Sequence, residues 1–219
     1  LRSTYTLGST PATQGLSEFP MITAPGIGTY QNDPVQKQGT GGDDGYLQDS
    51  AAGTMDDGVA GGTDWVNNAS TQQALLGVFN GAFYIDNTTK KPTWANFVAA
   101  SQAFGTNYNT GSSDGIGFVN DNPFQEYVVK ADAAITIAKM MYTLTYAIND
   151  GATGTAGTDE LSGQSLITLD IGSETAAGAG QKMFNIVRVT NDPLNADNSA
   201  VNSNVVVKFA PGSIGSLSY

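Results

Sequence analysis

The stretch "LLGVFNGAFYIDNTTKKPTW", residues 75–94, decides the fold class of this chain. Its first half alternates apolar with small residues, "DNTTKKP" reverses the chain, and Thr93 and Trp94 begin a second extended segment. A strand, a polar turn and a strand in this order predict a β-hairpin. We expect its apolar face to pack in the core and "DNTTKK" to form an exposed tip.

The clearest further strand signals lie toward the end of the chain. Alternate residues are apolar in "SLITLDIG" (165–172) and "KMFNIVRVTND" (182–192), as in half-buried antiparallel strands, and "NVVVKFAPG" (204–212) adds another strand. "GIGFVNDNPFQEYVVKADA" (115–133) predicts two strands around an Asn-Asp turn. We therefore expect a mainly β chain, an antiparallel barrel-like or sandwich-like single domain with long loops, one or two short helices and extended terminal arms.

Two segments are less regular. In "WANFVAASQAF" (94–104) the residues Trp94, Phe97 and Val98 have the i, i+3, i+4 spacing of a short helix. In 134–150 we expect a short helix or turn first and an extended segment after Met141, because Ala and Met favour helix while Ile, Thr and Tyr favour strand. The boundaries that follow are an arm over 1–19, a β-rich domain over 20–210 and a tail over 211–219.

Composition excludes several classes of function. The 219 residues include no cysteine and no histidine, so disulfides, thiolate metal sites and the usual general base are unavailable. Nine basic residues stand against twenty acidic ones, a formal charge of −11. Nucleic-acid binding depends on neutralising phosphates with Lys and Arg, so we expect no nucleic-acid partner. No window approaches the roughly 18 apolar residues of a membrane span, so we expect no membrane partner either.

The Asp- and Gly-rich segment 37–64 has two interpretations. Clustered carboxylates suit calcium, but Asp43, Asp44, Asp49, Asp56 and Asp57 lack the D-x-D-x-D-G spacing, and no Glu closes the segment. A solvated loop around a weak strand is the interpretation that we favour. The chain's other carboxylates offer little for hydrolysis, because most aspartates occur in turn contexts and Trp65 and Trp94 are isolated. We predict no enzyme activity, no catalytic residues and no cofactor or metal.

The order of these segments resembles one family. "QNDPV" (31–35) is followed by the 75–97 hairpin region, the strand pair of 115–133 and the final strands. This series is similar to the head decoration or cement proteins of tailed bacteriophages, of the type common in marine phages, over roughly residues 20–210. The resemblance implies a capsid-stabilising virion protein on the outer face of the phage head. Its implied partner is the major capsid protein, and it carries no catalytic residues.

As a hypothesis, the protein occupies symmetry axes of the capsid as a homo-oligomer, a trimer or a dimer. A cement protein needs arms or sheet edges that pair with neighbours, and strand addition would supply such contacts through backbone bonds. The candidate interface residues on the terminal arms are Leu1, Tyr5, Leu7, Ile214, Leu217 and Tyr219; frayed termini are the alternative. Two other functions remain open, a major capsid protein of single β-barrel type and a tail or fibre adhesin with an aromatic cleft for surface glycans.

Overall fold

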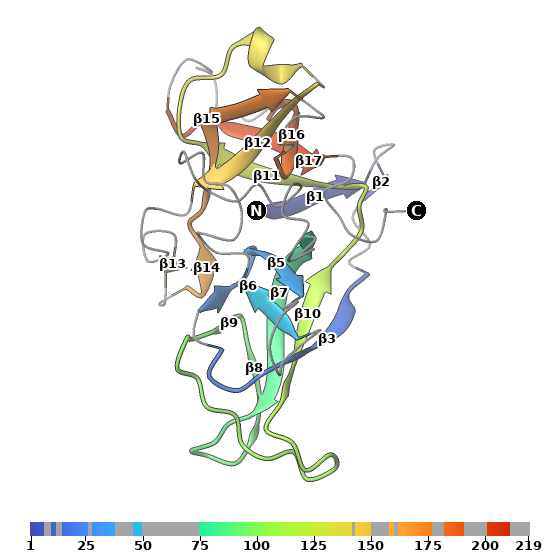
Figure 1. Cartoon of the computed structure of the whole chain (residues 1–219), viewed down its shortest axis with the longest axis vertical. Helices are drawn as coiled ribbons and strands as arrows, with labels where there is room; N and C mark the ends of the chain where they lie inside the picture. Colours follow the sequence, from blue (N-terminus) through green and yellow to red (C-terminus); the bar gives the residue numbers. More distant parts are fainter. Residues whose placement is uncertain are drawn as a thin grey trace.

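The computed structural model describes residues 1–6, 10–11, 15–25, 28–37, 46–49, 75–141, 143–149, 158–159, 162–176, 182–190 and 201–210. These residues form two larger β-sheets, two pairs of very short strands and one short 3-10 helix. The prediction of a mainly β, barrel-like chain is confirmed. Figure 1 shows the two larger sheets stacked along the long axis of the molecule.

The first sheet closes into a five-stranded barrel. Its strands are β11 (Gln125–Ala131), β12 (Leu144–Asn149), β15 (Thr168–Ala176), β16 (Phe184–Val189) and β17 (Asn204–Phe209), in the order β15-β12-β16-β17-β11. These neighbours are antiparallel, and a short parallel pairing of β11 with β15 closes the ring. β1 (Arg2–Thr6) pairs with β11, and β2 (Thr10–Pro11) pairs with β1, so the sheet extends beyond the barrel.

Alternating burial explains why these segments form barrel strands. In β15 and the residues before it, Ile167, Leu169 and Ile171 are buried, while the residues between them are more exposed. β16 is less regular, since Phe184, Asn185 and Ile186 are all buried, and Val187 is exposed at a register shift between Ile186 and Arg188. The barrel core also receives side chains from outside the ring, since Leu1, Leu75 and Val78 belong to it.

The second sheet is an open, curled sheet of six strands. Its order is β3-β10-β7-β5-β6, and a further strand, β8, pairs with the C-terminal half of β7. The strand bounds are β3 (Ser17–Met21), β5 (Pro34–Lys37), β6 (Leu47–Asp49), β7 (Leu75–Ile85), β8 (Pro92–Ala95) and β10 (Gly115–Asn120). β7 and β8 are the hairpin predicted from residues 75–94. Their inner face packs on a second core built around Met21, Phe79, Tyr84 and Phe104.

Small elements complete the described fold. β4 (Thr29–Tyr30) pairs with β9 (Phe97–Val98), and β13 (Thr158–Asp159) pairs with β14 (Gln164–Ser165). The 3-10 helix η1 (Ile137–Met140) precedes β12, so the prediction of a helical turn followed by an extended segment in 134–150 is confirmed. Most of the Asp/Gly segment 37–64 lies outside the described residues, apart from Lys37 and the residues around the short strand β6.

The helix predicted over 94–104 is wrong. Trp94 lies in β8 opposite Phe83, and Phe97 lies in β9 opposite Tyr30. The rings of Tyr30 and Phe97 are also stacked, with centroids 5.4 Å apart. Cross-strand pairing of large aromatic residues therefore overrides a weak helical spacing.

The "QNDP" turn at 31–34 joins the two cores. Asn32 has the positive φ of 77° that Asn tolerates in turns, and the carboxylate of buried Asp33 accepts the N–H of Tyr30 at 2.7 Å. The N–H of Asn32 donates to Phe79, and the N–H of Phe79 donates to Asp33, so the turn is bonded directly to β7. The motif is a structural turn, as its position after a short strand predicts.

Candidate functional site

The structure describes only two of the predicted interface residues. Leu1 is buried in the barrel core, and its ammonium group donates to the carbonyl of Asn32 at 3.3 Å. Burial lowers the pKa of this amine to about 6, and the negative charge of Asp33 partly opposes that shift. Leu1 therefore contacts its own chain. The backbone of Tyr5 lies in β1 opposite Pro11.

Leu7, Ile214, Leu217 and Tyr219 lie outside the described residues. The interface role of the arms stays a prediction.

A different candidate surface lies on the six-stranded sheet. Pairing places Pro20 of β3 opposite Ile116 of β10, Ile116 opposite Phe83 of β7, and Phe83 opposite Trp94 of β8. Directly paired residues point to the same side of a sheet. That side is opposite the core, because the neighbours of Phe83 on β7, Ala82 and Tyr84, are core residues. All four paired residues are exposed.

Together with Phe118, these four residues form what we call the outer face. The exposed fractions are 40% for Phe83, 49% for Trp94 and 37% for Ile116. If the full accessible surface of each side chain is about 200 Å², the three side chains together expose roughly 250 Å² to solvent. Single exposed apolar residues are ordinary, whereas the largest contiguous apolar patch of a typical monomer, about 300–600 Å², is often functional, so we treat the outer face as a candidate contact surface. One charged side chain borders these residues, since the exposed Glu18 of β3 is paired with Phe118 on the same side of the sheet.

Trp94 is held in place on the outer face. Its indole lies 4.9 Å from the ring of Phe118, measured between centroids. It also covers Gly81, where a Cβ atom would lie 2.7 Å from Cζ2 of Trp94. Gly81 has a φ of 136°, which other residues rarely adopt. The glycine thus lets the indole lie against the strand, and the fold holds Trp94 in position.

Both edges of the outer face are poor templates for another strand. β3 and β8 border the face, and they contain Pro20 and Pro92. Proline has no N–H to donate to an added strand, and it is a common device for blocking sheet edges. Contact through the face itself is therefore favoured over strand addition at these two edges.

A second apolar surface lies at the other end of the molecule, on the turn around η1 (the yellow helical turn at the top of Figure 1). Ile137 is 85% exposed and Met141 is 56% exposed, and none of the four residues of η1 is buried. Ala134 and Ala138 are exposed beside them. We call Ala134, Ile137, Ala138 and Met141 the η1 turn.

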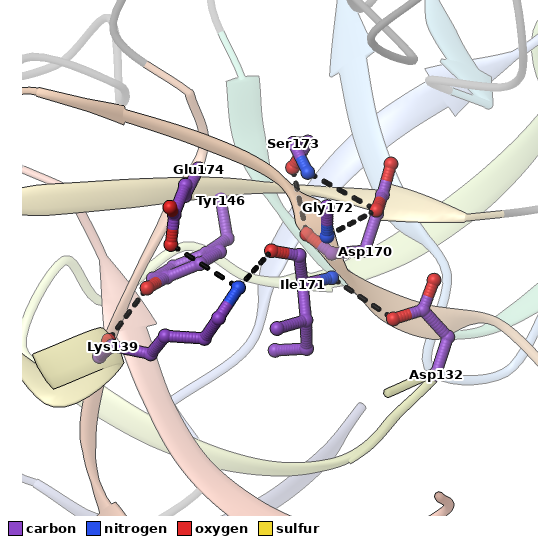
Figure 2. Close-up of polar contacts among 8 residues, drawn as sticks. All are labelled: Asp132, Lys139, Tyr146, Asp170, Ile171, Gly172, Ser173 and Glu174. Atoms are coloured by element: carbon purple, nitrogen blue, oxygen red, sulfur yellow. Dashed lines mark hydrogen bonds and ion pairs between the residues drawn. The ribbon is translucent and has the colours of Figure 1, made fainter. Parts of the chain in front are cut away.

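Polar contacts attach the η1 turn to the barrel (Figure 2). The hydroxyl of buried Tyr146 donates to the carbonyl of Lys139 at 2.6 Å. The Lys139 ammonium donates to the carbonyl of Ile171 at 3.1 Å and lies 3.2 Å from the carboxylate of Glu174. These contacts restrain the backbone of η1, in which Met140 packs against the barrel core while Ile137 and Ala138 are exposed.

The same close-up shows how β15 tolerates an irregular pairing with β12. The register shifts between the pairs Thr145–Thr175 and Ala147–Asp170, which leaves residues 171–174 opposite Tyr146 alone. Ser173 accepts the N–H of Ala147 at 2.8 Å, and the Asp170 carboxylate accepts the N–H groups of Gly172 and Ser173 at 2.8 and 3.1 Å. Side chains thus replace the missing ladder bonds of the bulge.

The polar side chains around this bulge in β15 make hydrogen bonds to the backbone. Burial and the nearby charge of Asp132 raise the pKa of Asp170, while the N–H groups of Gly172 and Ser173 partly oppose the shift. The Ser173 hydroxyl donates to the carbonyl of Asp170 at 2.7 Å, so its proton is already committed to a backbone bond. Among the described residues, no three His, Cys, Asp or Glu side chains gather closely enough to hold a metal ion.

Sequence reasoning missed the outer face because it assigned the apolar residues of 75–94 to the core. The available signal was that apolar residues occupy both alternating positions of the strand from Phe79 to Ile85. A half-buried strand should be apolar on one side only.

Comparison with protein-family models, with curated proteins and with solved structures found no match. In the described part of the chain, no helix has the length and hydropathy needed to cross a membrane.

Proposed function

We propose that this protein is a structural virion protein, a decoration or cement protein that binds the outer surface of a bacteriophage capsid and stabilises the shell. The observation that carries the proposal is the pair of exposed apolar surfaces, the outer face and the η1 turn, at opposite ends of a β body (Figure 1). A protein that stabilises a shell by contact must touch at least two neighbours. Two separate apolar surfaces would let one molecule contact two neighbours at the same time.

The electrostatics support this role. The formal charge of −11 gives the molecule no attraction for packaged nucleic acid, and it favours solubility before assembly. The resemblance in segment order to head decoration proteins points to the same function. The polar clusters described above make hydrogen bonds that support the fold, and the proposed role depends on contacts through the molecular surface.

The test is depletion and re-addition. Capsids stripped of this protein should lose resistance to heat, and re-addition of the purified protein should raise their melting temperature until the binding sites are filled. A Trp94→Ser, Phe83→Ser double variant should restore less stability at the same concentration, because it removes the largest exposed apolar side chains of the outer face. A Phe124→Ser variant is the control, since Phe124 is exposed but lies on neither apolar surface. Capsids with the same melting temperature with and without the protein would overturn the proposal.

A second candidate is a glycan-binding adhesin module, and the exposed Trp94 and Phe83 on a sheet surface favour it specifically. Sugar rings stack on exposed aromatic side chains, so Trp94 fluorescence should respond to the glycan in that case. Titration with host-surface glycans distinguishes the two candidates. A saturable change that Trp94→Ser abolishes would support the adhesin, and an unchanged spectrum would exclude this face as a glycan site.

A further inference from the structure

The wall of the barrel carries a row of three polar side chains across three neighbouring strands. Pairing places Asn185 of β16 opposite Lys208 of β17, and Lys208 opposite Glu126 of β11. Directly paired residues point to the same side of a sheet. The barrel core includes neighbours of all three residues along their strands: Tyr127, Phe184, Ile186, Val207 and Phe209. The row therefore lies on the side of the wall that faces away from the core.

Two members of this row are shielded from solvent although they point away from the core. Asn185 is 1% exposed and Glu126 is 7% exposed, while Lys208 is half-buried. The Asn185 carboxamide donates from Nδ2 to the carbonyl of Leu144 at 2.6 Å. The Glu126 carboxylate lies 2.7 Å from the guanidinium of Arg188. The strands thus place a primary amine between an oriented carboxamide and an oriented carboxylate.

We propose that Lys208 and Asn185 form an intramolecular isopeptide bond, with Glu126 as the proton carrier. The Nζ atom of Lys208 attacks Cγ of Asn185, the bond from Cγ to Nδ2 breaks, and an amide joins the two side chains. The Lys208 ammonium passes two protons through Glu126 to the departing nitrogen, which leaves as an ammonium ion. Atoms and charge balance without a further reactant.

The strand geometry favours this reaction. Directly opposite residues have Cβ atoms about 4.5–5.5 Å apart, a gap that a lysine side chain can span. Two rigid strands hold the amine and the carboxamide together, so their reaction is effectively unimolecular. The next pair on the same side is Val206 opposite Val128, and Val206 is buried. An apolar neighbour limits access of water, which would otherwise compete with the amine for Cγ.

A second pair of the same residue types shows what distinguishes the row. Lys130 of β11 lies directly opposite Asn204 of β17, on the two strands that also hold Glu126 and Lys208. Lys130 is exposed, and its partner on the other side is Thr168 of β15, whose hydroxyl does not carry protons as a carboxylate does. We therefore expect a bond at Lys208 and none at Lys130.

The bond would join β16 to β17, the last strand of the barrel. A covalent link between residues far apart in the chain restricts the unfolded state, and this restriction grows with the length of the loop that is closed. The barrel would then resist unfolding from its C-terminal strand. This inference goes beyond the proposed function and does not depend on it.

The experiment is mass spectrometry of the full chain under denaturing conditions. The intact mass should be lower than the sequence mass by one molecule of ammonia. Trypsin cleaves after unmodified lysine and arginine, so peptide 183–188 should remain attached to a peptide that spans 189–219. A full sequence mass would overturn the inference, and so would an ammonia loss that maps elsewhere, such as to cyclisation of Asn80 onto Gly81.

Variants assign the roles within the row, with circular dichroism to establish that each is folded. Lys208→Arg keeps the charge but removes the amine nucleophile, so it should have its full sequence mass. Glu126→Gln should form the bond at least about 100-fold more slowly after refolding. Lys130→Arg is the matched control and should lose ammonia as the wild type does. An ammonia loss that persists in Lys208→Arg would overturn the inference, whereas bond formation without capsid binding would overturn only the proposed function.

Discussion

At the scale of single residues, Gly81 and Trp94 show how the backbone of β7 determines a surface property. Gly81 occupies a backbone conformation that suits glycine, with a φ of 136°, and Trp94 lies where a Cβ on Gly81 would be. The exposed indole of Trp94 is thus held in a defined position by the backbone of β7. A side chain at position 81 would displace it and strain the strand.

We expect Gly81→Ala to lower the free energy of unfolding by about 2–4 kcal/mol, because it combines backbone strain with a steric clash. Gly111→Ala is the matched control, since Gly111 has a φ of 70° with no atom within 4 Å of the added Cβ. Its cost should be about 1–2 kcal/mol, from strain alone. Urea unfolding monitored by Trp fluorescence measures both, and equal losses would show that Trp94 does not press on Gly81.

Tyr146 predicts a dependence of stability on alkaline pH. Burial, aided by the charge of Glu174, raises the pKa of Tyr146 to about 12 from the 10.0 of an ordinary tyrosine. The folded protein therefore holds this proton more tightly than the unfolded chain. The resulting stability is fully present below pH 10 and is lost as the pH rises from 10 through 12.

A Tyr146→Phe variant isolates this contribution from the titration of lysines. At pH 8 it should be less stable than the wild type by about 0.5–1.5 kcal/mol, because the hydrogen bond to the carbonyl of Lys139 is lost. The difference should shrink between pH 10 and pH 12. Tyr108→Phe, at an 84% exposed position, should match the wild type throughout. A difference between Tyr146→Phe and the wild type that is constant up to pH 12 would contradict the assignment.

At the scale of elements, turns and strands were the parts most open to prediction. The 75–94 hairpin, the strands near 165–172, 182–192 and 204–212 and the helical turn before Met141 follow from alternation and turn residues. The helix over 94–104 failed because partners far along the chain, Phe83 and Tyr30, set the conformation of Trp94 and Phe97. Sequence spacing contains no information about such distant partners.

The "QNDP" turn provides a test at this scale. Asp33→Ala should destabilise the protein by about 1–3 kcal/mol, because it leaves the N–H of Tyr30 without its buried acceptor. The control is Asp121→Ala in the related "VNDNP" turn, where the carboxylate accepts a bond from the Ser17 hydroxyl in a partly buried setting. That loss should stay below about 1 kcal/mol. Chemical denaturation compares the two, and similar losses would argue against a special role for Asp33.

At the scale of the whole molecule, the fold class could be predicted from sequence, but the candidate surfaces could not. Alternation shows that a strand has two sides, yet both sides of the strand from Phe79 to Ile85 are apolar. Only the pairing of β3, β10, β7 and β8 shows that Pro20, Ile116, Phe83 and Trp94 share one exposed side. In the same way, the exposure of Ile137 depends on how Tyr146 and Lys139 hold η1.

The central claim is that this protein binds the outer surface of a capsid and stabilises the shell through these contacts. Its copy number and position on the intact particle, determined by quantitative mass spectrometry and electron cryomicroscopy, test that claim most directly. We predict a copy number comparable to that of the major shell protein and density on the outer face of the head. A few copies confined to the tail or to one vertex, or density inside the shell, would contradict the account.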